Sequence, residues 1–287
     1  MLGLGNSICT SIVPSQDAFT NGYSLLFDGA ASGAKCVIIP DHSSWEPTDD
    51  NEAWSFSFWL KSTRGLGESG THSANEFIMG CGTGSAPDGF RIKFNSGDNI
   101  IKLFFTSTDY DGAADFNNQT FDYDYTSATG ASNLRDGNWH NYTVSVVEGE
   151  PIRIWNNGNR VTLNTGASVS VPDGALDNWE VDDNNDGTYD LVVGANELKA
   201  QGFKGHIDEL AFWRGEITND IATAIYNSGT PIALDSDSGN YTLADELVMW
   251  QRFEEGTGTS TADSSSNSNT GTFHSAAPTW SSTVPGS

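Results

Sequence analysis

The chain has 287 residues, of which 38 are acidic and 13 basic, so its formal net charge is −25. Nucleic acid is excluded as an expected partner, because phosphate binding needs clustered Lys and Arg side chains. An anionic membrane surface is excluded for the same reason. The excess of acid has two explanations that both stay open, namely solubility and the binding of divalent cations.

The first residues and the cysteines indicate the compartment. Met1–Thr10 lacks the basic segment and the long apolar core of a secretory signal, and no stretch is long and apolar enough to span a membrane. We therefore expect a protein made in a cytoplasm without a signal peptide. Cys9, Cys36 and Cys81 have no regular spacing, which predicts three reduced thiols rather than a disulfide framework or a zinc site.

The elements predicted along the chain are mostly short strands. Residues 1–20 are polar and mixed, and we expect them to form an N-terminal arm. In residues 54–60, Trp54, Phe56 and Phe58 alternate with other residues, which predicts a strand with one buried face. Residues 106–138 are predicted to form a long loop that contains one strand. The further strands are expected, in chain order, over residues 90–94, 100–105, 121–125, 142–146, 152–155, 189–193, 206–213 and 247–253.

Two local signals are more specific. The turn at Asn156–Asn159 lies between two strand-like runs, and its Asn-Gly pair tolerates the positive φ angles of a tight hairpin. One short helix is predicted over residues 218–228, with Thr218 as its N-cap and Gly229 at its end.

Several motifs occur in an order that resembles a known family. They are Ser24–Gly29, Val37–Pro40, Phe56–Lys61, Asp136–His140, Ile152–Gly158 and Phe203–Trp213. Each is weak alone, but their shared order resembles laminin-G-like and pentraxin-like sandwiches of the concanavalin A type, over about residues 23–229. The resemblance implies an all-β fold: a two-sheet antiparallel jelly-roll sandwich with one short helix.

The last part of the chain departs from this arrangement. Leu247–Gly256 and Asp263–Asn267 resemble the segment that usually opens such domains, so the domain resembles a circular permutation. We expect residues 21–287 to form one sandwich that residues 240–287 complete. The alternative is a truncated second domain, which is disfavoured because about 40 residues bury too small a core alone.

An acidic loop is the strongest candidate for a metal site. The segment Asp182–Asp190 fits the pattern D-x-N-x-D-G-x-x-D, and calcium prefers six to eight oxygen ligands that a tight loop can bring together. The expected ligands are Asp182, Asn184, Asp186, Thr188 and Asp190. The alternative is an Asn- and Asp-rich turn without a metal.

The resemblance also implies a second, weaker metal candidate. Related sandwiches often hold a structural calcium near the chain ends, and Asp208 with Asp28 could provide such a site. A hydrogen-bonded Asp at a strand end is the alternative that we favour for Asp208.

No residues indicate catalysis. Glucanases of this fold place two acids on one strand in the pattern E-x-D-x-E, and the nearest match, Glu180–Asn184, ends in Asn. Glycan binding would instead need exposed aromatic side chains beside polar groups. The candidates are Trp155, Trp179, Tyr110, Tyr123 and Tyr125, and for each of them a place in the core is the favoured alternative.

These observations leave three classes of function. The first, which we favour, is a non-enzymatic structural or adhesion protein on a virion surface, such as a capsid-decoration, tail or fibre subunit of a phage, in contact with other subunits or copies of itself and with surface glycans. The second is a calcium-dependent lectin that acts outside the cell. The third, a glycoside hydrolase, is disfavoured by the missing pair of acids.

Overall fold

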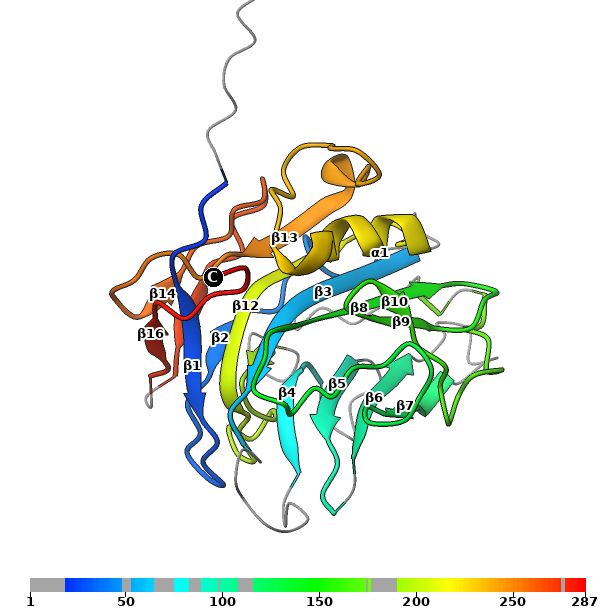
Figure 1. The fold of residues 1–287 in the computed structure, drawn as a ribbon, viewed down its shortest axis with the longest axis horizontal. Helices are drawn as coiled ribbons and strands as arrows, with labels where there is room; N and C mark the ends of the chain where they lie inside the picture. Colours follow the sequence, from blue (N-terminus) through cyan, green and yellow to red (C-terminus); the bar gives the residue numbers. More distant parts are fainter. Residues whose placement is uncertain are drawn as a thin grey trace, which may run out of the picture.

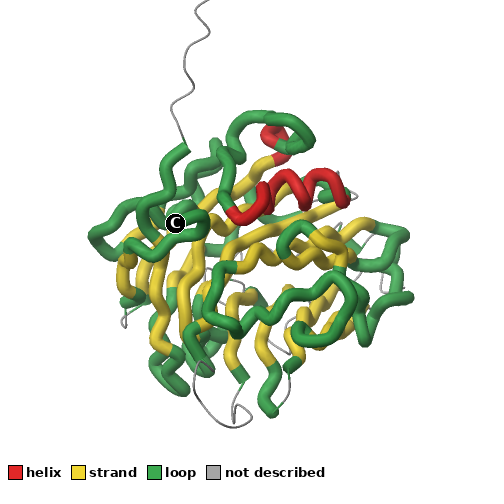
Figure 2. Tube along the Cα trace, viewed as in Figure 1, coloured by secondary structure: helices red, strands yellow, loops and turns green. Residues whose placement is uncertain are grey.

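The computed structural model describes residues 19–47, 53–64, 75–82, 89–97, 99–107, 116–173, 175–176, 190–274 and 277–287. Within these residues the chain forms two antiparallel sheets of eight strands each, packed face to face (Figure 1). Figure 2 shows how little of the fold is helical. None of the helices in the described part of the chain has the length and apolar character needed to cross a membrane.

Sheet 1 contains the two longest strands in the described part of the chain, β3 and β12, with ten residues each. Its strand order is β10-β9-β8-β3-β12-β1-β16. β13 pairs with the second half of β12, on the edge whose first half pairs with β1. The strands are β1 Ser24–Asp28, β3 Ala53–Ser62, β8 His140–Val147, β9 Arg153–Asn156, β10 Asn159–Arg160, β12 Lys204–Trp213, β13 Leu247–Gln251 and β16 Thr279–Ser281.

Sheet 2 lies behind sheet 1 and has the order β14-β15-β2-β11-β4-β5-β6-β7. Its strands are β2 Val37–Ile39, β4 Glu76–Gly80, β5 Gly89–Phe94, β6 Ile100–Ser107, β7 Phe116–Asp124, β11 Leu191–Val193, β14 Ser260–Thr261 and β15 Gly271–Phe273. The C-terminal segment contributes to both sheets, since β13 pairs with β12, β16 with β1, and β15 with β2.

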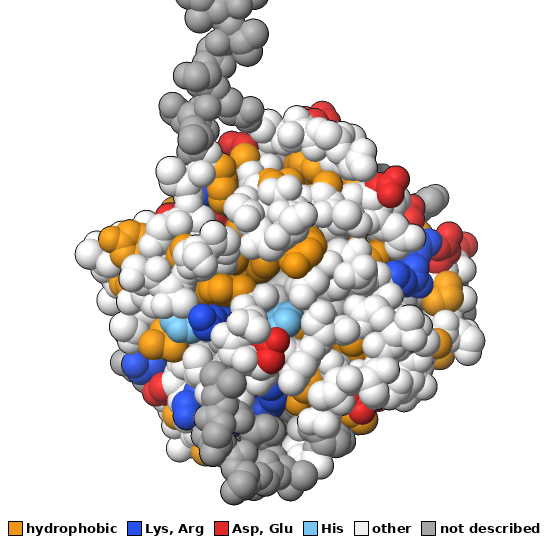
Figure 3. Space-filling model, viewed as in Figure 1, with side chains coloured by type: hydrophobic (Ala, Val, Ile, Leu, Met, Phe, Trp, Pro, Cys, Tyr) orange, Lys and Arg blue, Asp and Glu red, His pale blue; other side chains and the backbone are white. Residues whose placement is uncertain are grey.

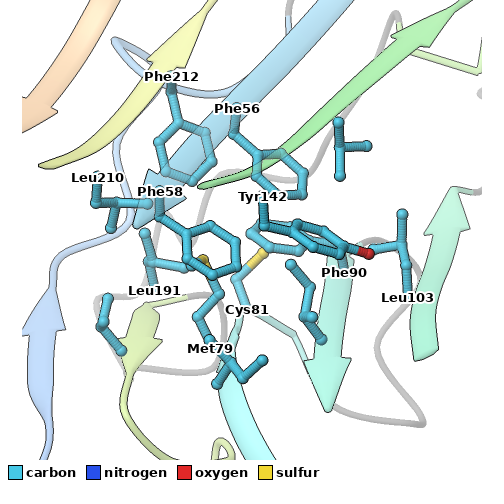
Figure 4. Close-up of a cluster of buried hydrophobic side chains, with 14 of the residues drawn as sticks. Phe56, Phe58, Met79, Cys81, Phe90, Leu103, Tyr142, Leu191, Leu210 and Phe212 are labelled. Carbon is cyan, nitrogen blue, oxygen red and sulfur yellow. The ribbon is translucent and has the colours of Figure 1, made fainter. Parts of the chain in front are cut away.

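The core lies between the two sheets. Phe56 and Phe58 of β3 and Phe212 of β12 point from sheet 1 toward Met79 and Phe90 of sheet 2 (Figure 4). The side chains of Trp54, Phe56, Phe58 and Leu60 have no exposed surface. The alternation that predicted one buried face of β3 is therefore present.

The opposite face of β3 is also buried, which the alternation did not predict. Ser57 and Trp59 are only 2% exposed, because a second layer covers this side of sheet 1. Helix α1, Asn219–Tyr226, crosses the sheet there (Figure 1), and Trp59 stacks on Tyr226 with ring centroids 5.8 Å apart. The polar residues beneath are satisfied by hydrogen bonds such as that between the Ser57 and Thr143 hydroxyls at 2.9 Å.

The helix has the predicted N-cap and a different end. The Thr218 hydroxyl accepts a hydrogen bond from the Ile221 amide, as expected of a cap. Asn227, with φ of 41°, ends the helix in the left-handed region, two residues before the expected Gly229. Two 3-10 turns follow, at Asn227–Gly229 and Ala244–Glu246.

Candidate functional site

Strand β12 positions the groups of the candidate site on the outward face of sheet 1. Lys204, His206 and Asp208 alternate with Gly205 and Ile207, and Ile207 belongs to the core. Residues two apart in a strand share a face, so Lys204, His206 and Asp208 all lie on the outward face. Part of this face is covered by α1, and the part over β1 and the first half of β12 is not (Figures 1 and 3).

A groove of about 430 Å³ lies across this uncovered part. Its lining comes from β1, β12 and β16, from the segment before β2 and from Thr63, which follows β3. The lining includes Leu26, Asp28, Lys35, Lys204, His206 and Thr279. Figure 3 shows Lys, Arg and His side chains gathered on this part of the surface, with a few acidic side chains among them.

Hydrogen bonds fix the polar groups of the groove. The Lys35 amine donates to the Thr279 hydroxyl at 3.3 Å. The Ser24 hydroxyl lies 3.1 Å from Nδ1 of His206 and donates to the Thr283 carbonyl at 2.7 Å. Because a hydroxyl has a single hydrogen to donate, Ser24 must accept from His206, and Nδ1 therefore carries the proton. In the neutral ring Nε2 is then an acceptor.

The imidazole of His206 is neutral at physiological pH. Its burial and the nearby charge of Lys61 lower its pKa to about 4. Lys61 lies directly opposite His206 on β3. The ring of Trp139 packs against His206 on the same face, with centroids 5.8 Å apart.

A β-bulge separates this groove from a second, acidic site. The pairing of β12 with β3 shifts register between Asp208 and Ala211, and Glu209 has a φ of 48°. An extra residue in one strand reverses which residues face inward. Before the bulge the odd-numbered Ile207 faces the core. After it the even-numbered Leu210 faces the core, and Ala211 faces the layer under α1.

The bulge brings three carboxylates together. It lies where the β12 edge passes from β1, which pairs with Lys204–Ile207, to β13, which pairs with Leu210–Trp213. One carboxylate oxygen each of Asp208, Glu209 and Glu254 lies within 4.8 Å of the other two. We call these three residues the acidic cluster.

The partners of the acidic cluster are well defined. Glu209 accepts a hydrogen bond from the Trp250 indole at 2.6 Å and lies 3.5 Å from the Arg252 guanidinium. Asp208 accepts from the Asn21 amide at 3.1 Å. Glu254 accepts from the backbone amides of Gly22 and Tyr23, so the cluster joins the start of the sandwich to its C-terminal segment.

The electrostatics of the cluster favour either a proton or a cation. Asp208 has no exposed surface and Glu209 is 3% exposed. Burial, with the repulsion from Glu209, raises the pKa of Asp208 well above its ordinary value. Burial raises the pKa of Glu209 to about 8, although Arg252 and Trp250 offset part of the shift. One arginine faces three carboxylates, which leaves negative charge for a proton or metal to neutralise.

The expected metal residues divide into three groups. Asp182, Asn184, Asp186 and Thr188 lie outside the described residues. Asp190 is described, and its Oδ1 accepts from the Asp41 amide at 3.1 Å. Asp28 is exposed and lies opposite Lys204, four residues along β12 from Asp208, which is about 13 Å at the usual rise of a strand. The structure therefore groups Asp208 with Glu209 and Glu254, and not with Asp28.

The expected glycan-binding aromatics need a correction. Tyr123 and Trp155 have no exposed surface and Tyr125 is 2% exposed. A buried ring offers no face to a sugar, so these three are core and packing residues, as the favoured alternative had it. Trp179 and Tyr110 lie outside the described residues.

Sequence reasoning named Asp208 and Asp28 as metal candidates but missed the groove and the other two members of the acidic cluster. The groove depends on a pairing of β1 with β16, more than 250 residues apart in the chain, which no local pattern predicts. The bulge did leave a signal: Ile207 and Leu210 are three residues apart, which interrupts the period of two.

Comparisons with known proteins identify the fold. No family model and no curated protein matches the sequence. The structure is similar to a protein from Bacteroides ovatus ATCC 8483, provisionally described as carbohydrate-binding, with a TM-score of 0.57 and 11% sequence identity over 93% of this chain. The chain spans 62% of the length of that protein.

Two further solved structures are similar at lower scores. One is a SAP-like pentraxin from Limulus polyphemus, with a TM-score of 0.41, 10% identity, and coverage of 72% of this chain and 82% of that one. The other is tailspike protein 2 from the Escherichia coli O157:H7 bacteriophage CAB120, with a TM-score of 0.46, 15% identity, and coverage of 83% and 31%. At these identities the likeness concerns the fold. The chain has the laminin-G-like, concanavalin-A-type sandwich fold that its sequence motifs predicted.

Proposed function

We propose that the chain is a non-enzymatic glycan-binding module that uses the groove over β1, β12 and β16. The observation that carries the proposal is the groove itself. Its volume of about 430 Å³ lies within the roughly 300–1,000 Å³ usual for ligand sites. It combines the apolar surface of Leu26 with the amines, hydroxyl and imidazole at its rim, which suits a ring that is apolar on one face and polar at its edge.

The placement of the carboxylates argues against hydrolysis of the glycan. A glycosidase needs two carboxyl groups that flank the scissile bond. Of the described residues that line the groove, Asp28 alone carries a carboxylate. Asp208 and Glu209 are paired but buried, so a polysaccharide has no route to them.

The proposal is tested by filling the groove. Thr279 is exposed at its rim, and Thr279→Trp should block it and abolish binding to the glycans that the unmodified protein selects on an array. Thr272→Trp places the same side chain at an exposed position of β15, which pairs in sheet 2, and should leave binding unchanged. Equal binding by both variants and the unmodified protein would exclude the groove as the site.

Calcium is proposed as a structural partner of the same module. Support comes from the acidic pattern at 182–190 and from the three carboxylates of the acidic cluster. Calcium at a hundredfold above its Kd should add about 2.7 kcal/mol to the free energy of unfolding.

Melts with calcium and with a chelator test the calcium proposal and locate the ion. Loss of the calcium effect in Asp186→Asn would place the ion in the loop, and its loss in Asp208→Asn would place it in the cluster. Identical melts of the unmodified protein in calcium and chelator would contradict both.

At the level of assembly, we propose that the module works on the surface of a virion. The support is the net charge of −25, which suits an exposed outer surface. Mass spectrometry of purified particles tests this. Detection of the chain at a fixed stoichiometry is the expected result, and its absence from all particles of the producing host would contradict the assembly role while leaving the groove proposal standing.

A further inference from the structure

The outward face of sheet 1 carries a row of side chains that crosses five strands. His206 of β12 lies opposite Lys61 of β3 on one side and opposite Leu26 of β1 on the other. Leu26 in turn lies opposite Thr279 of β16. Continuing the register of β8 with β3 by one residue places Trp139, which directly precedes β8, opposite Lys61. We call these five residues the transverse row.

The transverse row is longer than the groove. Leu26, His206 and Thr279 line the groove, and the row continues from His206 past Lys61 to Trp139. Neighbouring strands are about 4.8 Å apart, so the two ends of a row across five strands are about 19 Å apart. This distance exceeds the width of one pyranose ring, so a ligand that follows the whole row contains several sugar units.

Trp139 gives the row an aromatic surface at the end opposite Thr279. Its ring packs on the imidazole of His206, with centroids 5.8 Å apart, and the residue is only half-buried. It differs in this respect from Trp155 and Tyr123, which have no exposed surface. A large, rigid ring of this kind offers contact area to a ligand at a low cost in conformational entropy.

The other end of the row offers hydrogen bonds. Thr279 is exposed, and its hydroxyl accepts from the Lys35 amine at 3.3 Å. The hydroxyl keeps its own hydrogen to donate. A row with apolar surface in its length and a polar group at its exposed end suits a chain of sugar units, because their ring faces carry C–H groups and their edges carry hydroxyls.

We propose that the glycan site extends beyond the groove to Trp139 and takes an extended, β-1,4-linked chain of pyranose units. The inference rests on the proposed glycan-binding function. One unit occupies the groove beside Leu26 and Thr279, and a later unit stacks on Trp139. Equatorial β-1,4 bonds produce an extended, nearly flat chain, which can follow a row across the sheet, whereas a curved chain leaves the surface after the groove.

The dependence of affinity on chain length tests the proposal on the full chain. Calorimetry measures the affinities of oligosaccharides of two to six units from cellulose, xylan and chitin, which are all β-1,4-linked. We expect the affinity in at least one series to increase with the first added units and to become constant once the oligosaccharide spans the row. Oligosaccharides of laminaran, whose β-1,3 linkage curves the chain, should gain less from added units.

Trp139→Ala separates the extension from the groove. It should weaken the binding of the longest oligosaccharide about tenfold, as expected for the loss of an aromatic contact. It should leave the shortest oligosaccharide that binds unaffected, because that ligand occupies the groove alone. Trp139→Phe keeps a ring and should recover part of the loss. Thr279→Trp blocks the groove itself and should weaken the binding of both lengths.

Fluorine NMR of the protein labelled with 5-fluorotryptophan detects the contact without a substitution at the site. The Trp139 resonance, assigned by its absence in Trp139→Phe, should shift on addition of the longest oligosaccharide and not of the shortest. The Trp155 resonance is the matched control. Trp155 has no exposed surface, so its resonance should stay unchanged with both.

The outcomes distinguish the extension from the groove. Equal weakening of short and long oligosaccharides by Trp139→Ala would show that Trp139 acts by holding His206, and would overturn the extension alone. An affinity that does not change with chain length would do the same, as would an array that selects other glycans while all three β-1,4 series fail to bind. Failure of these series and of a wider glycan array would overturn both levels. Melting curves of the variants show whether a loss of binding reflects unfolding.

Discussion

The two ends of the outward face of β12 differ in almost every property, although they are only a few residues apart. The end at Lys204 and His206, which we call the open end, borders the groove that Lys35 and Lys204 line, although His206 itself is only 7% exposed. At Asp208 and Glu209 the face is closed, and carboxylates are buried against Trp250. The difference is produced by one bulge and by the change of neighbouring strand from β1 to β13.

One strand thus contributes both to a candidate binding groove and to a link between segments that are far apart in the chain. The open end is free of the α1 layer, and the groove lies there. The closed end links segments far apart in the chain, since Asn21, Gly22 and Glu254 all bond there. Changes at the closed end should therefore alter stability, and changes at the open end should alter binding.

The largest effect is expected from removing the segment that supports both ends. Deletion of residues 240–287 removes β13, β14, β15 and β16, together with Thr279 of the groove and Glu254 of the cluster. The loss of strands from both sheets should exceed the 5–15 kcal/mol by which domains are usually stable. The shortened chain should show no cooperative melt by circular dichroism. A cooperative transition would show instead that residues 240–287 form a separate element.

The next largest effect is expected at the closed end. Trp250 is 2% exposed, stacks on Phe19 at 6.2 Å and donates to Glu209. Trp250→Ala should cost about 3–5 kcal/mol in urea unfolding, because it opens a cavity and removes a partner of a buried carboxyl. Trp250→Phe keeps a ring and loses the hydrogen bond, so it should cost less. Equal losses in the two variants would assign the effect to the hydrogen bond rather than to packing.

The pH dependence of stability should separate the two ends, because their pKa shifts have opposite signs. Glu209 has a folded pKa of about 8 against an ordinary value of 4.5. The folded state thus holds a proton that the unfolded state has lost, and stability falls as pH rises from about 4.5 to about 8. His206 has a folded pKa of about 4 against 6.5. Here the unfolded state holds the extra proton, and stability rises with pH from about 4 to 6.5.

Below pH 6.5 the contributions of Glu209 and His206 change stability in opposite directions. Between pH 6.5 and 8 only the loss of stability remains. At about 1.4 kcal/mol per pH unit, the unmodified protein in chelator should lose roughly 2 kcal/mol over that upper window. Urea unfolding at pH 5, 6.5 and 8 measures this. Glu209→Gln should reduce the decline over the upper window, where buried Asp208 still contributes, and His206→Gln should steepen the decline between pH 5 and 6.5. A gain of stability from pH 6.5 to 8 in the unmodified protein would contradict the account of the cluster.

The sequence allowed the core of the fold to be predicted but, apart from Asp208 and Asp28, not the residues of the candidate site. Trp54, Phe56 and Phe58 alternate, and the family motifs lie in order, so the sandwich followed from local patterns. The burial of Ser57 and Trp59 depends on α1 packing over the sheet, and a period of two carries no information about what covers a strand. Trp155 has the core place that was the favoured alternative for it, since it packs under α1 and donates to Asn219 at 2.8 Å.

The groove and the cluster depended on long-range register, which the sequence does not encode in a local pattern. Thr279 reaches the groove because β16 pairs with β1, and Glu254 reaches the cluster because it accepts from Gly22. Only the three-residue step from Ile207 to Leu210 indicated the bulge in advance.

The smallest effect on stability is expected at the open end. Lys35 and Lys204 are half-buried at the rim of the groove, and surface substitutions of this kind usually change the free energy of unfolding by less than about 0.5 kcal/mol. Lys35→Gln and Lys204→Gln should therefore melt as the unmodified protein does while they bind the proposed glycan more weakly. A residue that contributes to binding and not to stability is positioned for a ligand, whereas one that contributes to both also has a structural role. If either variant instead destabilises the protein by more than about 1 kcal/mol, its amine stabilises the fold. The two ends of β12 would then differ in exposure and not in function.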